Sequence, residues 1–124
     1  MELDAAALGE QEARLDELLA LLGLVWDQPA DRRVEVLAAR QPLYPQFHRI
    51  GHKRQLVIRA LEDDRRSVVE HYPVVLRAVV ADRDTNSPRW LVAVLAGAVG
   101  RRRAERDLLA AGASADALRW VRLL

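Results

Sequence analysis

A chain of 124 residues has the length of one domain and can bury roughly two thirds of its unfolded surface, which is enough for a real core. It contains no cysteine, so disulfides and thiolate metal sites are excluded. The acidic N-terminus lacks the basic and apolar regions of a signal peptide, and we expect a cytoplasmic protein.

The net charge of +1 hides an uneven distribution. Residues 1–31 contain eight acids and one base, which gives −7, whereas residues 32–124 contain eighteen bases and ten acids, which gives +8. This asymmetry predicts an acidic first helix that docks either on the chain's own basic part or on a basic partner.

The first predicted helix covers residues 4–26. Apolar residues recur at steps of three and four, which places them on one face; they are Leu8, Leu15, Leu18, Leu22 and Val25. This face either packs inside the domain or forms a coiled-coil seam for self-association through helix 4–26.

A short second helix ends before Pro42, and residues 43–46 are expected to form a loop bracketed by prolines. The third helix is predicted over residues 47–62, with a basic side that includes Arg49, Lys53 and Arg59. Two continuations stay open. Either Ser67 and Glu70 form a capping box that begins a fourth helix, bent at Pro73, or the third helix runs on to His71 and a new helix starts at Pro73.

The longest uncharged run, residues 90–100, predicts a central buried helix with Ser87 as N-cap and Pro88 in the first turn. Small residues on one face predict the close approach of a neighbouring helix, so we expect Gly97→Leu to destabilise the fold through overpacking. The small residues are Ala93, Ala96, Gly97 and Gly100. Three arginines that follow the run are expected to complement the negative end of this helix. At about 11 residues the run is too short to span a membrane.

Residues 105–111 are predicted to form either a short helix or a continuation of the central helix beyond Gly100, with Gly112 at the end. A last helix over residues 114–124 is predicted, with Ser114 as its cap. No segment alternates as a half-buried strand does. The predicted fold is all-α: one domain, 1–124, forming a compact bundle of six or seven helices, with an acidic N-terminal helix 4–26 and a basic helical body 30–124.

Two acidic turns, residues 61–64 and 80–84, each precede a helix that opens with apolar residues. This pattern resembles HEAT-type α-solenoid repeats. The resemblance covers at most residues 30–100 and implies stacked antiparallel helix pairs with a concave interaction surface. A compact irregular bundle explains the same pattern.

The sequence offers little catalytic chemistry. His48 and His52 have the i, i+4 spacing of a shared metal site, but Arg49 and Lys53 would repel a cation. The segment 82–86 starts like a calcium loop, yet position 6 is not glycine and position 12 is not glutamate. Nucleophile motifs and phosphate-binding loops are missing from the sequence. We therefore predict no enzyme, no metal and no cofactor.

The basic clusters are the candidate binding residues: Arg49, Lys53, Arg59, Arg101, Arg102, Arg103 and Arg106. We predict that they receive an acidic protein partner, which makes the chain a protein-interaction module or an oligomerising subunit. The alternative is nucleic-acid binding through phosphates. Against it, the whole domain is nearly neutral and aromatic residues do not interleave with the arginines, so base stacking is unsupported. A third interpretation is that these cations form salt bridges with the chain's own acidic first helix.

Overall fold

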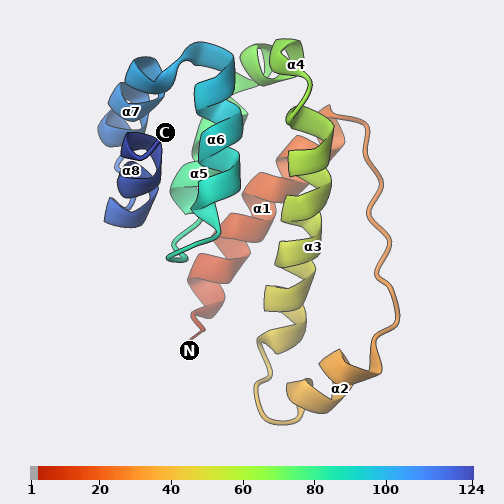
Figure 1. Ribbon diagram of the computed structural model, residues 1–124. Coiled ribbons are helices and arrows are strands. Elements are labelled where there is room, and N and C mark those ends of the chain that lie inside the picture. Colours follow the sequence, from red (N-terminus) through yellow and green to blue (C-terminus); the bar gives the residue numbers. More distant parts are fainter. Residues whose placement is uncertain (1–2) are drawn as a thin grey trace. The chain divides into compact units, whose positions relative to one another are not determined.

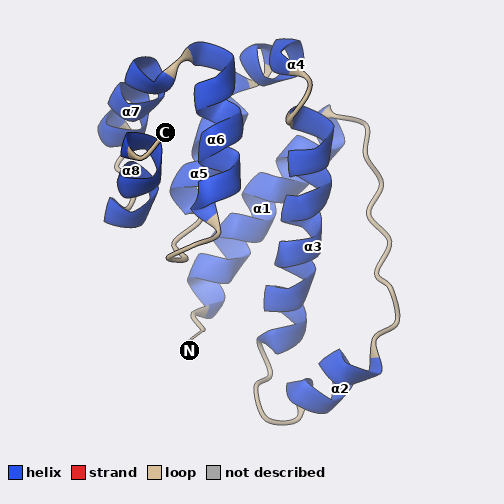
Figure 2. Cartoon of the chain, in the orientation of Figure 1, coloured by secondary structure: helices blue, strands red, loops and turns tan. Residues whose placement is uncertain are grey.

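The structure is a computed structural model that describes residues 3–124. Within this described range it contains eight helices and no strand (Figures 1 and 2). The all-α prediction is confirmed, and the number of helices exceeds the predicted six or seven by at least one. The chain divides into two units, Met1–Val57 and Ile58–Leu124, with the boundary inside the third helix.

Unit 1 begins with α1, Ala5–Leu21, whose N-cap Asp4 accepts hydrogen bonds from the backbone amides of Ala6 and Ala7 at 2.9 and 3.4 Å. The prediction that this helix reaches Trp26 was wrong. Gly23 has a left-handed φ of 67°, and the Leu24 amide donates to the Leu19 carbonyl. A glycine in this conformation satisfies the last carbonyls and turns the chain away from the helix axis.

The next helix, α2, Arg32–Ala38, is short and capped by Asp31, which accepts from the Arg33 amide at 2.9 Å. Val34 is its one buried residue. The helix is preceded by a long irregular segment, visible in Figure 1 as the extended connection between α1 and α2.

The third helix, α3, Tyr44–Leu61, includes the residues that were predicted to form a loop. That prediction was wrong because Pro45 lies in the first helical turn, where no intrahelical amide donor is required. The helix ends at Leu61, close to the predicted end at 62 and far from the alternative at His71.

Unit 2 splits the predicted fourth helix into α4, Arg65–Glu70, and α5, Tyr72–Ala81. Asp64, not Ser67, is the N-cap of α4: its carboxylate accepts from the Ser67 amide at 3.0 Å and from the Ser67 hydroxyl at 2.7 Å. The predicted capping box was therefore wrong. Pro73 lies in the first turn of α5, so its missing amide starts a new helix instead of bending a longer one.

The predicted central helix is α6, Pro88–Val99, which packs against α4, α5, α7 and α8 inside unit 2. Leu91, Val92 and Leu95 are at most 1% exposed. The predicted burial of this helix is confirmed for the face that carries these three residues. The Ser87 hydroxyl does not cap the helix but donates to the buried Asp82 carboxylate at 2.7 Å.

The other face of α6 is open. Ala93, Gly97 and Gly100 are exposed, and a Cβ added at Gly97 would meet nothing within 4 Å. Of the four small residues only Ala96 is buried. The predicted close approach at Gly97 was therefore wrong, and the reason to expect destabilisation by Gly97→Leu disappears with it.

The last helices are α7, Arg101–Ala110, and α8, Ala115–Arg122. Gly112, with φ 78°, follows α7, and the Ser114 hydroxyl accepts from the Ala117 amide at 3.2 Å, as predicted. Gly100, with φ 91°, is the single residue between the end of α6 and the start of α7. The arginines after Gly100 consequently begin α7 instead of completing α6. None of the described helices is both long and apolar enough to cross a membrane.

Candidate functional site

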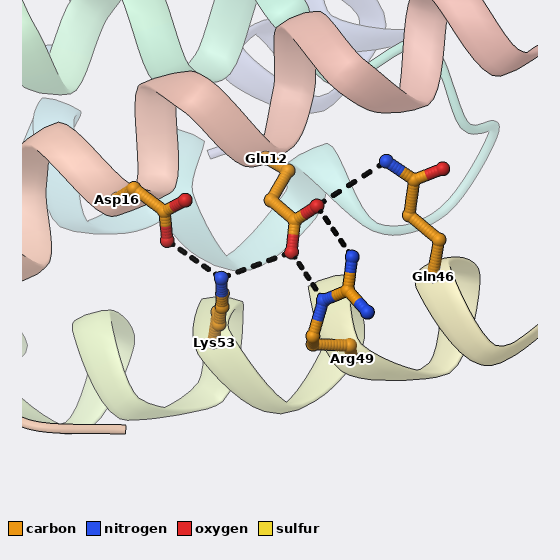
Figure 3. A network of polar contacts seen from close by, with 5 residues as sticks. All are labelled: Glu12, Asp16, Gln46, Arg49 and Lys53. Atoms are coloured by element: carbon orange, nitrogen blue, oxygen red, sulfur yellow. Dashed lines mark hydrogen bonds and ion pairs between the residues drawn. The ribbon is translucent and has the colours of Figure 1, made fainter. Parts of the chain in front are cut away.

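The basic side of α3 meets the acidic side of α1 within unit 1 (Figure 3). Glu12 lies at the centre: Arg49 Nη2 donates to it at 2.8 Å, Lys53 Nζ at 2.9 Å and Gln46 Nε2 at 3.2 Å. A second Arg49 nitrogen, Nε, also donates to Glu12, which makes the guanidinium–carboxylate pair bidentate. Lys53 Nζ further donates to Asp16 at 2.6 Å. We call these five residues the Glu12 network.

Glu12 and Lys53, at the centre of this network, are largely buried, whereas Asp16 at its edge is exposed. Lys53 is only 8% exposed, and its Nζ also lies 5.1 Å from the centre of the Trp26 ring, a cation–π distance. The hydrogen bond from Arg49, with those from Lys53 and Gln46, lowers the pKa of Glu12 from 4.5 to about 2, against the opposing effect of burial. Two of the predicted partner-binding cations are therefore bound to the chain's own first helix.

Arg59 is exposed and lies in the last turn of α3, in the part of that helix that belongs to unit 2. No acidic partner is seen for it among residues 3–124. The three α3 cations predicted as one surface thus divide into two with internal partners and one without.

The second predicted cluster stays together on the surface. Arg101, Arg102, Arg103 and Arg106 are exposed and line one shallow hollow with Val99 and Gly100. We call these four residues the α7 arginine cluster. Its members differ in their neighbours: Arg103 and Arg106 lie 3.5 and 3.4 Å from Asp107. Neither Arg101 nor Arg102 has an acidic partner within the part of the chain that the structure describes.

The helix that carries the cluster increases its positive potential. The N-cap of α7 is Gly100, which has no side chain to accept from the first amides, and the first turn contains no acid. The unpaired amides at the start of a helix act as a partial positive charge. Arginines at this end are electrostatically unfavourable unless an anion joins them, so the surface favours a negatively charged group.

Asp107 is held at the far side of the cluster. It accepts a hydrogen bond from the Tyr72 hydroxyl at 2.6 Å, which lowers the pKa of Asp107, and the Arg103 guanidinium carbon lies 4.7 Å from the centre of the Tyr72 ring. Burial and the adjacent carboxylate raise the pKa of Tyr72 to about 12. Arg103 is thus positioned between a ring and a carboxylate, whereas Arg101 and Arg102 are not.

Unit 1 also has a groove of about 390 Å³ between α2, α3 and the segment that precedes α2. Trp26, Pro45 and the adjacent histidines His48 and His52 are among its lining residues. The two imidazole centres are 4.4 Å apart. Among the described residues no group of three or more His, Cys, Asp or Glu side chains is arranged to hold a metal.

Sequence reasoning missed one cluster. Arg89 on α6 lies between two indoles, with its guanidinium carbon 5.7 Å from the Trp90 ring centre and 5.4 Å from that of Trp120 on α8. Arg119 continues the series, 5.0 Å from Trp120. The prediction that aromatic residues do not interleave with arginines was therefore wrong at these four residues. The signal available was the Arg-Trp dipeptide, which occurs at 89–90 and again at 119–120.

In comparisons with protein-family models, curated proteins and solved structures, no match to this chain was found.

Proposed function

We propose that the chain is a non-enzymatic protein-interaction module whose α7 arginine cluster binds an acidic segment of a partner protein. The observation that carries the proposal is the state of Arg101 and Arg102: both are exposed, and both lie at the positive end of a helix without an acidic partner among the described residues. A carboxylate-rich segment would supply the missing anions. We place the module in the cytoplasm as part of the same proposal.

The α3 cations contribute less to this proposal than the sequence suggested. Arg49 and Lys53 already bind Glu12, so a partner would have to displace a largely buried internal carboxylate to reach them. Arg59 is accessible, but it is one cation and lies on a different helix from the α7 arginine cluster. The proposed surface therefore comprises Arg101, Arg102, Arg103 and Arg106.

Self-association through helix 4–26 is the less favoured form of the proposal. Leu15 and Leu18, at the centre of the apolar face of α1, are at most 2% exposed in the single chain. Leu21, at the end of this helix, is 47% exposed and could contact a second copy. A coiled coil requires a continuous row of exposed apolar residues, which this face does not offer. Size-exclusion chromatography with light scattering tests this form, and a stable dimer would favour it.

A HEAT-like arrangement is a further part of the proposal, and only unit 2 supports it. In this unit the hairpins α5–α6 and α7–α8 follow each other, and α6 packs against α7 and α8. Each hairpin is shorter than a HEAT repeat of about 40 residues. The α7 arginine cluster would then lie at the junction of two successive hairpins.

Binding of a fluorescein-labelled deca-glutamate peptide, followed by fluorescence anisotropy at low ionic strength, tests the proposal. We expect the double variant Arg101→Glu/Arg102→Glu to lose at least about tenfold in affinity, because truncated or reversed charge pairs at an interface cost several kcal/mol. The matched control is Arg32→Glu/Arg33→Glu. This variant changes the net charge equally, at two exposed arginines that also begin a helix.

The control pair differs in one respect that matters: Asp31 caps its helix and Glu35 lies in the first turn. Its local potential is therefore lower, and its reversal should change peptide affinity much less. Equal losses in the two variants would reduce the effect to net charge and contradict a specific surface. A duplex DNA of equal charge that binds in place of the peptide would favour the nucleic-acid alternative.

A further inference from the structure

The second feature of unit 2 is the alternation of indole and guanidinium planes across α6 and α8. Its members, which we call the Trp–Arg ladder, are Trp90, Arg89, Trp120 and Arg119. The link between the helices is Arg89, because it lies within 6 Å of both indole centres and cation–π attraction operates at that distance. The ladder is distinct from the α7 arginine cluster, since the two share no residue.

Two further contacts hold the ladder in place. The Trp120 indole N–H donates to the backbone carbonyl of Thr85 at 2.9 Å, which fixes the ring relative to the loop that precedes α6. Arg119 lies 3.5 Å from Asp116 on the same helix. The inner planes are therefore arranged before any ligand arrives, which reduces the entropy that binding must overcome.

The end of the ladder is open. Trp90 is 51% exposed, the only tryptophan among the large apolar side chains that are exposed in the described chain. Its neighbour Arg89 is also exposed and lies within 6 Å of the Trp90 and Trp120 ring centres. An exposed indole face attracts a flat ring or a cation. The adjacent guanidinium disfavours a cation and attracts an anion.

A nucleotide combines these two features, because it has a flat base and a negatively charged phosphate a short distance away. We infer that the open end of the Trp–Arg ladder is a nucleotide-binding site, in which the base stacks on Trp90 and Arg89 contacts the phosphate. Aromatic rings combined with arginines are the usual platform for unpaired bases. The ligand is either a free nucleotide or one residue of a single strand. This inference is independent of the proposed acidic protein partner.

The test uses a fluorescein-labelled dT10 oligonucleotide and an abasic decamer with the same number of phosphates, each titrated by anisotropy at low salt. The native chain should bind dT10 at least about fivefold more tightly than the abasic strand, since one stacked base is worth this factor or more. Trp90→Ala should reduce that preference to near unity and leave abasic binding unchanged. Equal affinity of the native chain for the two strands would overturn the inference.

Two variants separate stacking from folding. Trp90→Phe keeps a flat ring and should retain most of the preference, whereas Trp90→Leu keeps apolar bulk without the ring and should lose it. Circular dichroism confirms that each variant is folded. A preference for dT10 that survives in Trp90→Leu would contradict stacking on this ring.

The remaining measurements identify the source of the nucleotide and separate the two sites. Thymidine monophosphate that displaces dT10 assigns the site to free nucleotides, and displacement only by unlabelled oligonucleotide assigns it to a single strand. Arg101→Glu/Arg102→Glu should keep the ratio of dT10 to abasic affinity while it loses the acidic peptide. Loss of that ratio in this variant would show that the α7 arginine cluster, not the ladder, accounts for binding and would overturn the inference.

Discussion

The two basic clusters of this chain look alike in the sequence and differ in their surroundings. In the Glu12 network the cations of α3 are bound to carboxylates of α1, and Lys53 is almost completely buried. In the α7 arginine cluster the cations are exposed, and Arg101 and Arg102 have no acidic partner within residues 3–124. A basic residue in this chain is therefore a candidate for binding a partner only where no acidic side chain of the same unit already pairs with it.

The largest effect is expected at the centre of the Glu12 network. Glu12→Ala removes the only acidic partner described for Arg49 and leaves the buried Lys53 ammonium with Asp16 alone, and the loss of a charge partner in such a position is costly. We expect a loss of about 3 kcal/mol in the free energy of unfolding, measured by urea titration. Glu10→Ala is the matched control, because Glu10 is 60% exposed and contacts only Arg14; it should cost less than about 1 kcal/mol.

Acid should remove the same stabilisation. The folded pKa of Glu12, about 2, lies below its ordinary value of 4.5, so the contribution is complete above about pH 4.5 and is lost as the pH falls toward 2. Between about pH 5 and pH 3 we expect the native chain to lose about 2 kcal/mol more than Glu12→Gln, which has no carboxylate to protonate. Parallel pH profiles of the two proteins would show that Glu12 is not the group responsible.

The next effect concerns the exposed face of α6 in unit 2, around Gly97. Gly97→Ala should stabilise the chain by up to about 1 kcal/mol, because a Cβ meets nothing there and glycine is a poor helix former. Thermal unfolding measures the shift, and Gly97→Leu should have the same sign. Destabilisation by either variant would show that a neighbouring element covers this face.

The smallest effect concerns the α7 arginine cluster itself. Arg101→Glu places an acid at the positive end of α7 and should raise the free energy of unfolding by about 0.5 kcal/mol. This direction is opposite to that expected for a cation with an internal partner. A measurable loss of stability would mean that Arg101 has such a partner.

The sequence was sufficient to predict features that depend on local chemistry. The all-α class, the buried face of α6 around Leu91 and Leu95, and the ends at Gly112 and Ser114 follow from periodicity and caps, which involve near neighbours. Local signals failed where two of them competed. Ser67 was predicted to be the N-cap, yet Asp64, three residues earlier, caps the helix by accepting a hydrogen bond from the Ser67 amide.

The site depended on contacts between distant residues. One interpretation of the charge split, that the basic residues bind the acidic first helix, agrees with the contacts of Arg49 and Lys53, which lie 37 and 41 residues from Glu12. This interpretation does not apply to Arg101 and Arg102, which have no acidic partner among the described residues. The pairing of Arg89 with Trp120 could not be predicted from spacing, because it requires α6 and α8 to pack together.

The most direct test of the difference between the two clusters is the urea unfolding of two single charge reversals, Arg49→Glu and Arg102→Glu. Arg49→Glu places a second carboxylate against Glu12 and should lower the free energy of unfolding by more than about 2 kcal/mol. Arg102→Glu, at a helix N-terminus without an acidic neighbour, should leave it unchanged or raise it slightly. Equal losses in the two variants, or no loss in Arg49→Glu, would contradict the division into an internal and an external cluster.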